Sequence, residues 1–115
     1  MNARPVELLL KEKKIYEIVN PRLVQAGPHI SVEDAVNLMR ERRSGYIVIA
    51  EEKKVVGLFT EADVVQKILE KEPDWSKPVR EFMLREPPIL SMNDSVGRAI
   101  DLMGRQRLYH IPLVD

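Results

Sequence analysis

Residues 31–51 read SVEDAVNLMRERRSGYIVIAE, and residues 95–115 read SVGRAIDLMGRQRLYHIPLVD. The two segments align without a gap at an offset of 64 residues, and seven of the 21 aligned pairs are identical. Unrelated segments of average composition would share roughly one or two identities over this length. Because the identities continue past the helical pattern into the apolar segment that follows, the chain is predicted to contain a duplicated structural unit.

Each copy of the repeat begins with a predicted amphipathic helix. Apolar residues recur at the i, i+3, i+4, i+7 spacing of one buried face, namely Val32, Ala35, Val36 and Met39 in the first copy and Val96, Ala99, Ile100 and Met103 in the second. Ser31 is expected to cap the first helix, and Ser44-Gly45 to end it. The apolar, β-branched segment Tyr46–Ala50 then indicates a strand buried on both faces.

The first copy continues with a hairpin and a second helix. Glu51–Lys54 is a charged turn, and Val55–Phe59 is the predicted return strand. Thr60–Glu70 is the predicted helix, with four apolar residues facing inward: Val64, Val65, Ile68 and Leu69. The second copy has no sequence equivalent of residues 52–70, so we expect it to be incomplete at its C-terminal side and to expose a strand edge.

Shorter elements are predicted around the two copies. They are an amphipathic helix and junction over residues 1–20, with Val6, Leu9 and Leu10 on one face, a short helix through Phe82-Met83, and strands at Leu23-Val24, Ile89-Leu90 and Tyr109–Val114. Two prolines within residues 71–78 indicate a linker, in which Trp75 is expected either to pin the linker to the core or to cover a dimer surface. The predicted domains are a lead-in (1–14), a first repeat (15–72), a linker (73–78) and a truncated second repeat (79–115).

The composition narrows the possible functions. The chain has 115 residues, 18 basic and 18 acidic side chains, no cysteine and two histidines. Zero net charge argues against a general nucleic-acid binder, and the lack of cysteine excludes disulfides and thiolate metal sites. The longest apolar run, Tyr46–Ala50, is too short to span a membrane. The sequence contains no arrangement of nucleophile and base and no phosphate-binding glycine loop, so we do not expect an enzyme. With two distant histidines and no cysteine we expect no metal site, and with no membrane span we expect a cytoplasmic protein.

Three segments carry a resemblance to the CBS domain, named after cystathionine β-synthase. The first is AVNLMRERR (35–43), mirrored by AIDLM (99–103). The second is VVGLFTEAD (55–63), which resembles the family's Gly-x-x-Thr/Ser-x-x-Asp turn from strand to helix. The third is HIPLVD (110–115), which is similar to the family's entry into its central strand. With the lead-in VREFM (79–83), the resemblance covers roughly residues 15–115 and indicates a tandem pair.

The resemblance implies an α/β (α+β) fold, a CBS-domain pair in which two β-α-β-β-α repeats pack sheet to sheet about a pseudo-twofold axis. In many members the clefts between the repeats bind AMP, ADP, ATP or S-adenosylmethionine. Such pairs require no cofactor, commonly form homodimers, and regulate a partner enzyme, channel or transporter. Because the second copy lacks its own Gly-x-x-Thr-x-x-Asp turn, only one of the family's two sites is expected to be complete.

Six residues are predicted to bind the ligand: Gly57, Phe59, Thr60, Asp63, Tyr46 and His110. Gly57 gives the backbone room, and Thr60 and Asp63 stand at a helix start, where free N–H groups favour an anion. The Asp63 carboxylate can accept both hydroxyls of a ribose. The same Thr60-x-x-Asp63 spacing also fits a capping box, so the residues leave binding and capping open.

The two remaining candidates also have alternatives. The resemblance places His110 near a phosphate bound by the neighbouring repeat, whereas the residue alone is equally compatible with a half-buried histidine that has a backbone partner. Tyr46 stands at the matching position of the first copy, where it stacks on a base or packs, and packing is favoured. Two functions follow: a regulatory module that senses an adenosine-containing ligand, or a ligand-independent dimerisation module in which Thr60 and Asp63 only cap a helix.

Overall fold

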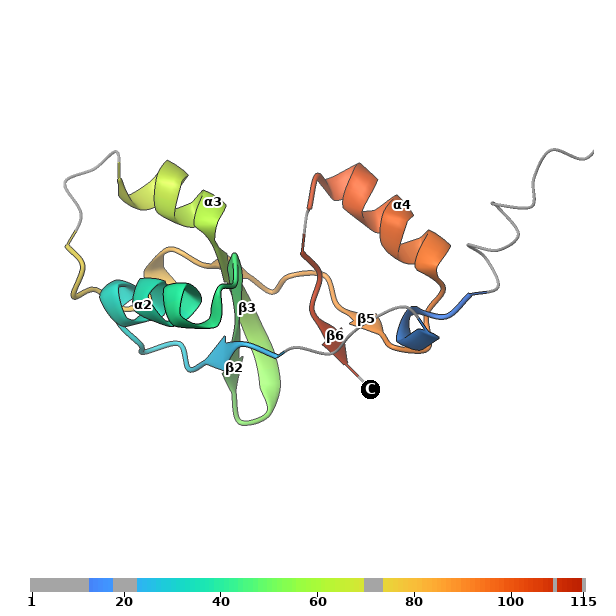
Figure 1. Ribbon diagram of the computed structural model, residues 1–115, viewed down its shortest axis with the longest axis horizontal. Helices are drawn as coiled ribbons and strands as arrows, with labels where there is room; N and C mark the ends of the chain where they lie inside the picture. Colours follow the sequence, from blue (N-terminus) through green and yellow to red (C-terminus); the bar gives the residue numbers. More distant parts are fainter. Residues whose placement is uncertain (1–12, 18–22, 70–73, 109, 115) are drawn as a thin grey trace, which may run out of the picture. The chain divides into compact units, whose positions relative to one another are not determined.

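The computed structural model describes residues 13–17, 23–69, 74–108 and 110–114 (Figure 1). The predicted helix face at Val6, Leu9 and Leu10 lies outside these residues, as does Tyr109. Within the described part, contacts divide the chain into two units. The first unit contains residues 23–69 and 74–87, and the second combines residues 13–17 with the described residues from Pro88 onward. Helices and strands occur in both units, as the predicted α+β class requires.

The first unit is built on a four-stranded sheet in the order β1-β2-β3-β4. The strands are β1 (Gln25–Ala26), β2 (Tyr46–Glu51), β3 (Lys54–Thr60) and β4 (Leu84–Arg85). β1 runs parallel to β2, and the other two pairs are antiparallel. Ile47, Val48 and Ile49 of β2 are all buried, which confirms a strand covered on both faces. The strand predicted at Leu23-Val24 is displaced to β1, although Val24 is buried.

Helix α2 (Val32–Arg42) has the predicted start and a different end. The Ser31 side chain accepts a hydrogen bond from the Asp34 backbone N–H at 3.0 Å, so it is the N-cap. At the other end Arg43 takes a left-handed conformation (φ 51°), and its N–H and that of Ser44 donate to carbonyls of the last turn. The prediction that Ser44-Gly45 ends the helix was therefore wrong by one residue, because an arginine takes the left-handed cap position that usually holds glycine.

The hairpin between β2 and β3 turns on two charged residues. Glu52 (φ 50°) and Lys53 (φ 66°) are both left-handed, which is the backbone of the two-residue turn that matches strand twist. Glu51 pairs with Lys54 across this turn, so both strands extend one residue further than predicted.

The segment after β3 is less regular than the predicted helix over Thr60–Glu70. It consists of one turn of α3 (Glu61–Asp63) followed by the π-helix η2 (Val64–Ile68). Ile68 is buried and Val64 is half-buried, as predicted, but Val65 is 55% and Leu69 57% exposed. The prediction that these two face inward was wrong, because the π-turn changes the period on which it relied.

Residues 74–87 pack in the first unit, although residues 79–87 belong in sequence to the second copy of the repeat. η3 (Val79–Glu81) is a single 3-10 turn, which replaces the helix predicted through Phe82-Met83. The Val79 N–H donates to the Ile30 carbonyl at 2.8 Å, and the Val79 side chain is fully buried. Trp75 packs against the core of this unit, as predicted.

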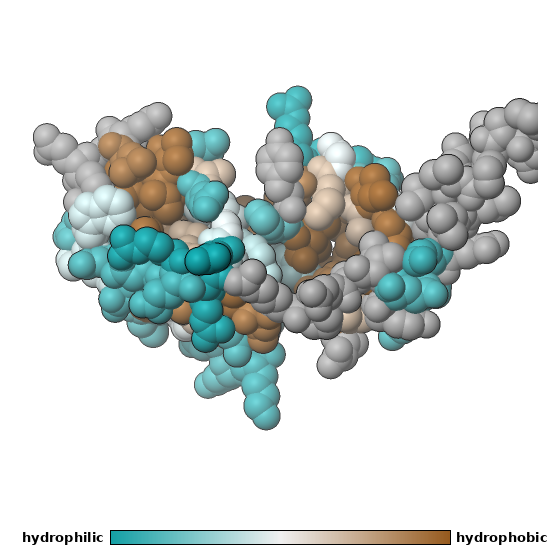
Figure 2. Space-filling view, in the orientation of Figure 1, coloured by the Kyte–Doolittle hydropathy of each residue, from teal (hydrophilic) through white to brown (hydrophobic). Residues whose placement is uncertain are grey.

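The second unit is smaller. It contains η1 (Ile15–Glu17), the helix α4 (Val96–Gln106) and a parallel pair of strands, β5 (Leu90–Ser91) and β6 (Leu113–Val114). The strand predicted over Tyr109–Val114 is thus only two residues long among those described. Ile100, predicted to be buried, is 52% exposed, and Val96 is the buried residue of α4. Hydrophobic surface accordingly lies over α4 and over α3–η2 (Figure 2).

The segment before each copy packs with the other copy. In the second unit Lys14 forms an antiparallel bridge with Ser95, and the Ile15 N–H donates to the Asp94 carbonyl at 2.9 Å. In the first unit Pro78 forms the equivalent bridge with Ser31. Lys14 and Pro78 are 64 residues apart, as are Ser31 and Ser95, so the two bridges follow the offset of the repeat. The repeat boundaries read from sequence and the compact units are therefore two different divisions of the chain.

Candidate functional site

The turn from β3 into α3 holds two of the predicted ligand-binding residues in direct contact. The Asp63 Oδ2 atom accepts hydrogen bonds from the Thr60 backbone N–H at 2.9 Å and from Thr60 Oγ1 at 3.3 Å. Thr60 Oγ1 in turn accepts from the Asp63 backbone N–H at 3.4 Å. These contacts form a capping box, so the capping role that the spacing allowed is present. Asp63 is only 8% exposed, which makes it a buried carboxylate.

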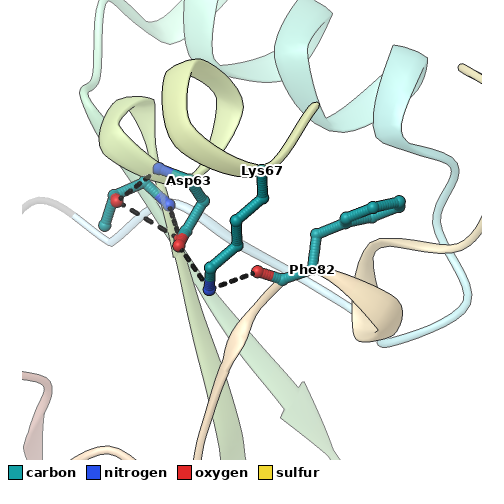
Figure 3. Close-up of polar contacts among 4 residues, drawn as sticks. Asp63, Lys67 and Phe82 are labelled. Carbon is teal, nitrogen blue, oxygen red and sulfur yellow. Dashed lines mark hydrogen bonds and ion pairs between the residues drawn. The ribbon is translucent and has the colours of Figure 1, made fainter. Parts of the chain in front are cut away.

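Lys67, which sequence reasoning missed, completes the surroundings of this carboxylate (Figure 3). Its Nζ atom lies 2.8 Å from Asp63 Oδ1 and donates to the Phe82 carbonyl at 2.9 Å. The i, i+4 spacing of Asp63 and Lys67 was a visible signal for the ion pair. The bond to Phe82 crosses 15 positions of sequence and joins η2 to the start of the second copy.

Gly57 and Phe59 of β3 are both enclosed by other parts of the protein. A Cβ atom on Gly57 would come within 2.3 Å of Met83 Sδ, so the absence of a side chain makes room for Met83. Phe59 is fully buried in the hydrophobic core of the first unit. Both residues therefore lie on β3 just before the Thr60–Asp63 turn, and both are buried by packing within the protein.

Tyr46 lies beside the turn. It pairs with Thr60 across β2 and β3 and is half-buried. His110 belongs to the second unit, where it is half-buried and precedes β6. Within the first unit the structure thus brings together five of the six predicted residues on one hairpin and its exit: Tyr46, Gly57, Phe59, Thr60 and Asp63.

A surface cavity of about 630 Å³ opens in the first unit between α2 and the α3–η2 segment. Its wall includes Met39, Arg43, Gly45, Glu61 and Val64. The predicted ligand-binding residues, all of which the structure describes, do not line it. The cavity therefore adjoins the Thr60–Asp63 turn at Glu61, although the side chains of Thr60 and Asp63 are not among its lining residues.

The described residues also bear on metal binding and on insertion into a membrane. Residues 13–17, 23–69, 74–108 and 110–114 contain no group of three or more His, Cys, Asp or Glu side chains placed to hold a metal ion. In the same ranges, no helix combines the length and apolar character needed to cross a bilayer.

The sequence was compared with known protein families. Residues 15–70 and 79–115 match the CBS domain. The chain belongs to the CBS domain family. The two matched segments are the two copies of the repeat, so the chain contains a CBS pair.

Curated CBS relatives include longer proteins. The chain is 24% identical over 102 residues to an uncharacterized 17.7 kDa protein of Acidianus ambivalens, covering 88% of this chain and 61% of that one. It is 31% identical over 108 residues to the inosine-5'-monophosphate dehydrogenase of Aquifex aeolicus, covering 92% of this chain and 21% of the enzyme. The chain thus spans less than two thirds of either relative, and the likeness to the dehydrogenase concerns only a part of that enzyme.

Solved structures confirm the CBS-pair fold. An uncharacterized conserved protein from Pyrococcus horikoshii has a TM-score of 0.83 and 25% identity, covering 91% of this chain and 80% of that protein. A CBS domain protein from Pyrobaculum aerophilum, complexed with AMP, has a TM-score of 0.82 and 18% identity over 89% of this chain and 79% of that one. The CBS domain pair of protein MJ0100, complexed with 5'-methylthioadenosine and S-adenosyl-L-methionine, has a TM-score of 0.79 and 21% identity over 90% and 81%.

Proposed function

We propose that this CBS pair is a regulatory module that binds an adenosine-containing ligand at the Thr60–Asp63 turn and transmits its occupancy to a partner protein. The observation that carries the proposal is the buried Asp63 carboxylate, held beside Thr60 where β3 passes into α3. A carboxylate has two oxygens that match the two hydroxyls of a ribose. That CBS pairs of the same fold have been solved with AMP and with S-adenosylmethionine supports adenosine as the shared group.

The proposal gives the other predicted residues subordinate roles. Tyr46 would pack beside the base or sugar, because it pairs with Thr60 across the hairpin. His110 would contact a phosphate. Gly57 and Phe59 would support the turn through their packing on β3. The chain itself would catalyse nothing and would act in the cytoplasm, with a regulated enzyme or transporter as its partner.

Calorimetry and thermal shift with AMP, ADP, ATP, S-adenosylmethionine and NADH test the proposal. A ligand present at 100 times its dissociation constant should stabilise the protein by about 2.7 kcal/mol, which is a shift of several degrees in Tm. Asp63→Asn should weaken binding by about tenfold or more, because one acceptor and the charge are lost. The absence of binding by every ligand would contradict the proposal.

The capping role of Asp63 requires a matched control. Ser31→Ala removes the equivalent side-chain cap from α2, away from the proposed site. It should lower Tm by an amount typical of a lost cap and leave the dissociation constant unchanged. If Asp63→Asn lowers Tm in the same way without changing the affinity, Asp63 is a cap and the ribose contact is elsewhere.

A second candidate function is a ligand-independent homodimer or docking module. It is favoured by exposed apolar side chains on the helices of both units: Val65, Leu69 and Ile100. A related CBS-CP12 protein from bloom-forming cyanobacteria, 24% identical, was solved as a hexamer. Sedimentation without ligand tests this candidate, and a monomer at high concentration would contradict it.

A further inference from the structure

The Asp63 carboxylate is already engaged by three donors. Oδ2 accepts two hydrogen bonds from Thr60, and Oδ1 lies 2.8 Å from Lys67 Nζ. An ionised carboxylate offers about four acceptor positions, so three of them are taken within the unit. A ribose that donates both of its hydroxyls to Asp63 must therefore displace one partner.

Lys67 is the partner that can leave. The two bonds from Thr60 belong to the capping box and hold the start of α3, whereas the Lys67 contact is made by a flexible side chain. The Lys67 side chain is 43% exposed, against 12% for that of Asp63. Rotation of Lys67 away from Oδ1 therefore frees an acceptor without unfolding the turn.

When Lys67 rotates away from Asp63, its ammonium group loses the carboxylate with which it was paired. The bond to the Phe82 carbonyl retains the side chain near the site, and two of its three N–H donors then need a new acceptor. A phosphate group on the ligand supplies that acceptor with a negative charge. A neutral nucleoside supplies neither, and a sulfonium ligand brings a second cation towards the first.

We propose that Lys67 is a specificity-determining residue that selects adenosine ligands carrying a phosphate over those that carry none. This inference rests on the proposed function, since it requires the ribose to bind at Asp63. It commits the site to an adenine nucleotide and against S-adenosylmethionine and 5'-methylthioadenosine. The Lys67 ammonium leaves the Asp63 carboxylate and pairs with the phosphate of the ligand.

Calorimetry on the full chain tests the inference with three probes: AMP, 5'-methylthioadenosine and S-adenosylmethionine. The wild-type protein should bind AMP more tightly than the other two. Lys67→Met should weaken AMP about fivefold, the value of one partly exposed ion pair, and should leave 5'-methylthioadenosine unchanged or tighter. Lys67→Arg retains the charge and should restore the preference for AMP.

Each outcome has one interpretation. If Lys67→Met changes the affinities for AMP and 5'-methylthioadenosine by the same factor, or if the wild-type protein prefers a ligand without phosphate, the inference is wrong and the proposed function stands. If the wild-type protein binds none of the probes, or if Asp63→Asn binds all of them unchanged, the proposed function is wrong. Should Lys67→Met fail to fold, Lys67→Gln keeps a donor for the Phe82 carbonyl and carries the same comparison.

Discussion

Helices α2 and α4 are the same element in two settings. Each has 11 residues, each starts after a serine N-cap, and each ends at an arginine in the left-handed conformation. They nevertheless differ in burial. Three residues of α2 are buried, whereas in α4 only Val96 is, and Ile100 is exposed.

The difference shows that helix formation and helix burial have separate causes. Caps and helical spacing are local, so both copies form the helix from their own sequence. Burial needs neighbours, and α2 has them in β2, β3 and η2, whose residues Ile47, Phe59 and Ile68 belong to the same core cluster. Among the described residues from Pro88 onward, α4 is accompanied by two strands, β5 and β6, and by no element equivalent to β3 or η2.

The matched pair Ile47 and Ile111 offers the largest test of this comparison. Ile47 is fully buried and Ile111 is half-buried. Ile47→Ala should lower the free energy of unfolding by about 3 kcal/mol, because it leaves a cavity in a closed core, and Ile111→Ala by about 1 kcal/mol. Denaturant unfolding, with hydrogen exchange of the α2 and α4 amides, measures both. Equal losses would show that the two cores are equally packed.

Gly57 tests the contribution of β3 to the packing of the first unit. Gly57→Ala brings a Cβ within 2.3 Å of Met83 Sδ and 2.9 Å of its Cγ, so Met83 must move. We expect a loss of about 1–2 kcal/mol in the free energy of unfolding. The double variant with Met83→Ala should recover part of it in the same denaturation experiment, whereas additive losses would mean that the two residues do not meet.

The serine caps test the part that the two copies share. Ser31 and Ser95 each accept from the backbone N–H three residues later, at 3.0 Å and 3.1 Å. Ser31→Ala and Ser95→Ala should each cost about 1 kcal/mol of helix stability, since capping does not depend on the core behind the helix. Local hydrogen exchange in each helix is the measurement. A much smaller effect at Ser95 would mean that capping does depend on burial.

Gly104 gives the smallest effect, and it should be favourable. It stands in α4 at the position that Arg40 holds in α2, and a Cβ there would meet nothing within 4 Å. Gly104→Ala should therefore stabilise α4 by about 0.5–1 kcal/mol. Circular dichroism during thermal unfolding would detect the gain, and a loss would indicate a contact at this position that the structure does not contain.

Local patterns predicted much of the fold. The spacing of Val32, Ala35 and Met39 and the β-branched segment after Gly45 identified α2 and β2, and the repeat identified α4 before any contact was known. The exposure of Val65 and Leu69 could not be read in this way, because it depends on a π-turn that no spacing rule anticipates.

The candidate site was predictable only in part. The Thr60-x-x-Asp63 spacing indicated both the cap and the carboxylate, and the capping box is present. The link from Lys67 to the Phe82 carbonyl was not predictable, because it depends on where residues 74–87 pack. The same is true of Ile15, whose buried position in the second unit follows from contacts far away in sequence.

The two exchanged bridges link each copy to the other. Lys14, just before the first copy, pairs with Ser95 of the second, and Pro78, just before the second copy, pairs with Ser31 of the first. Each copy therefore supplies the pairing partner for the residue that precedes the other. A single copy expressed alone would lack that partner within its own chain.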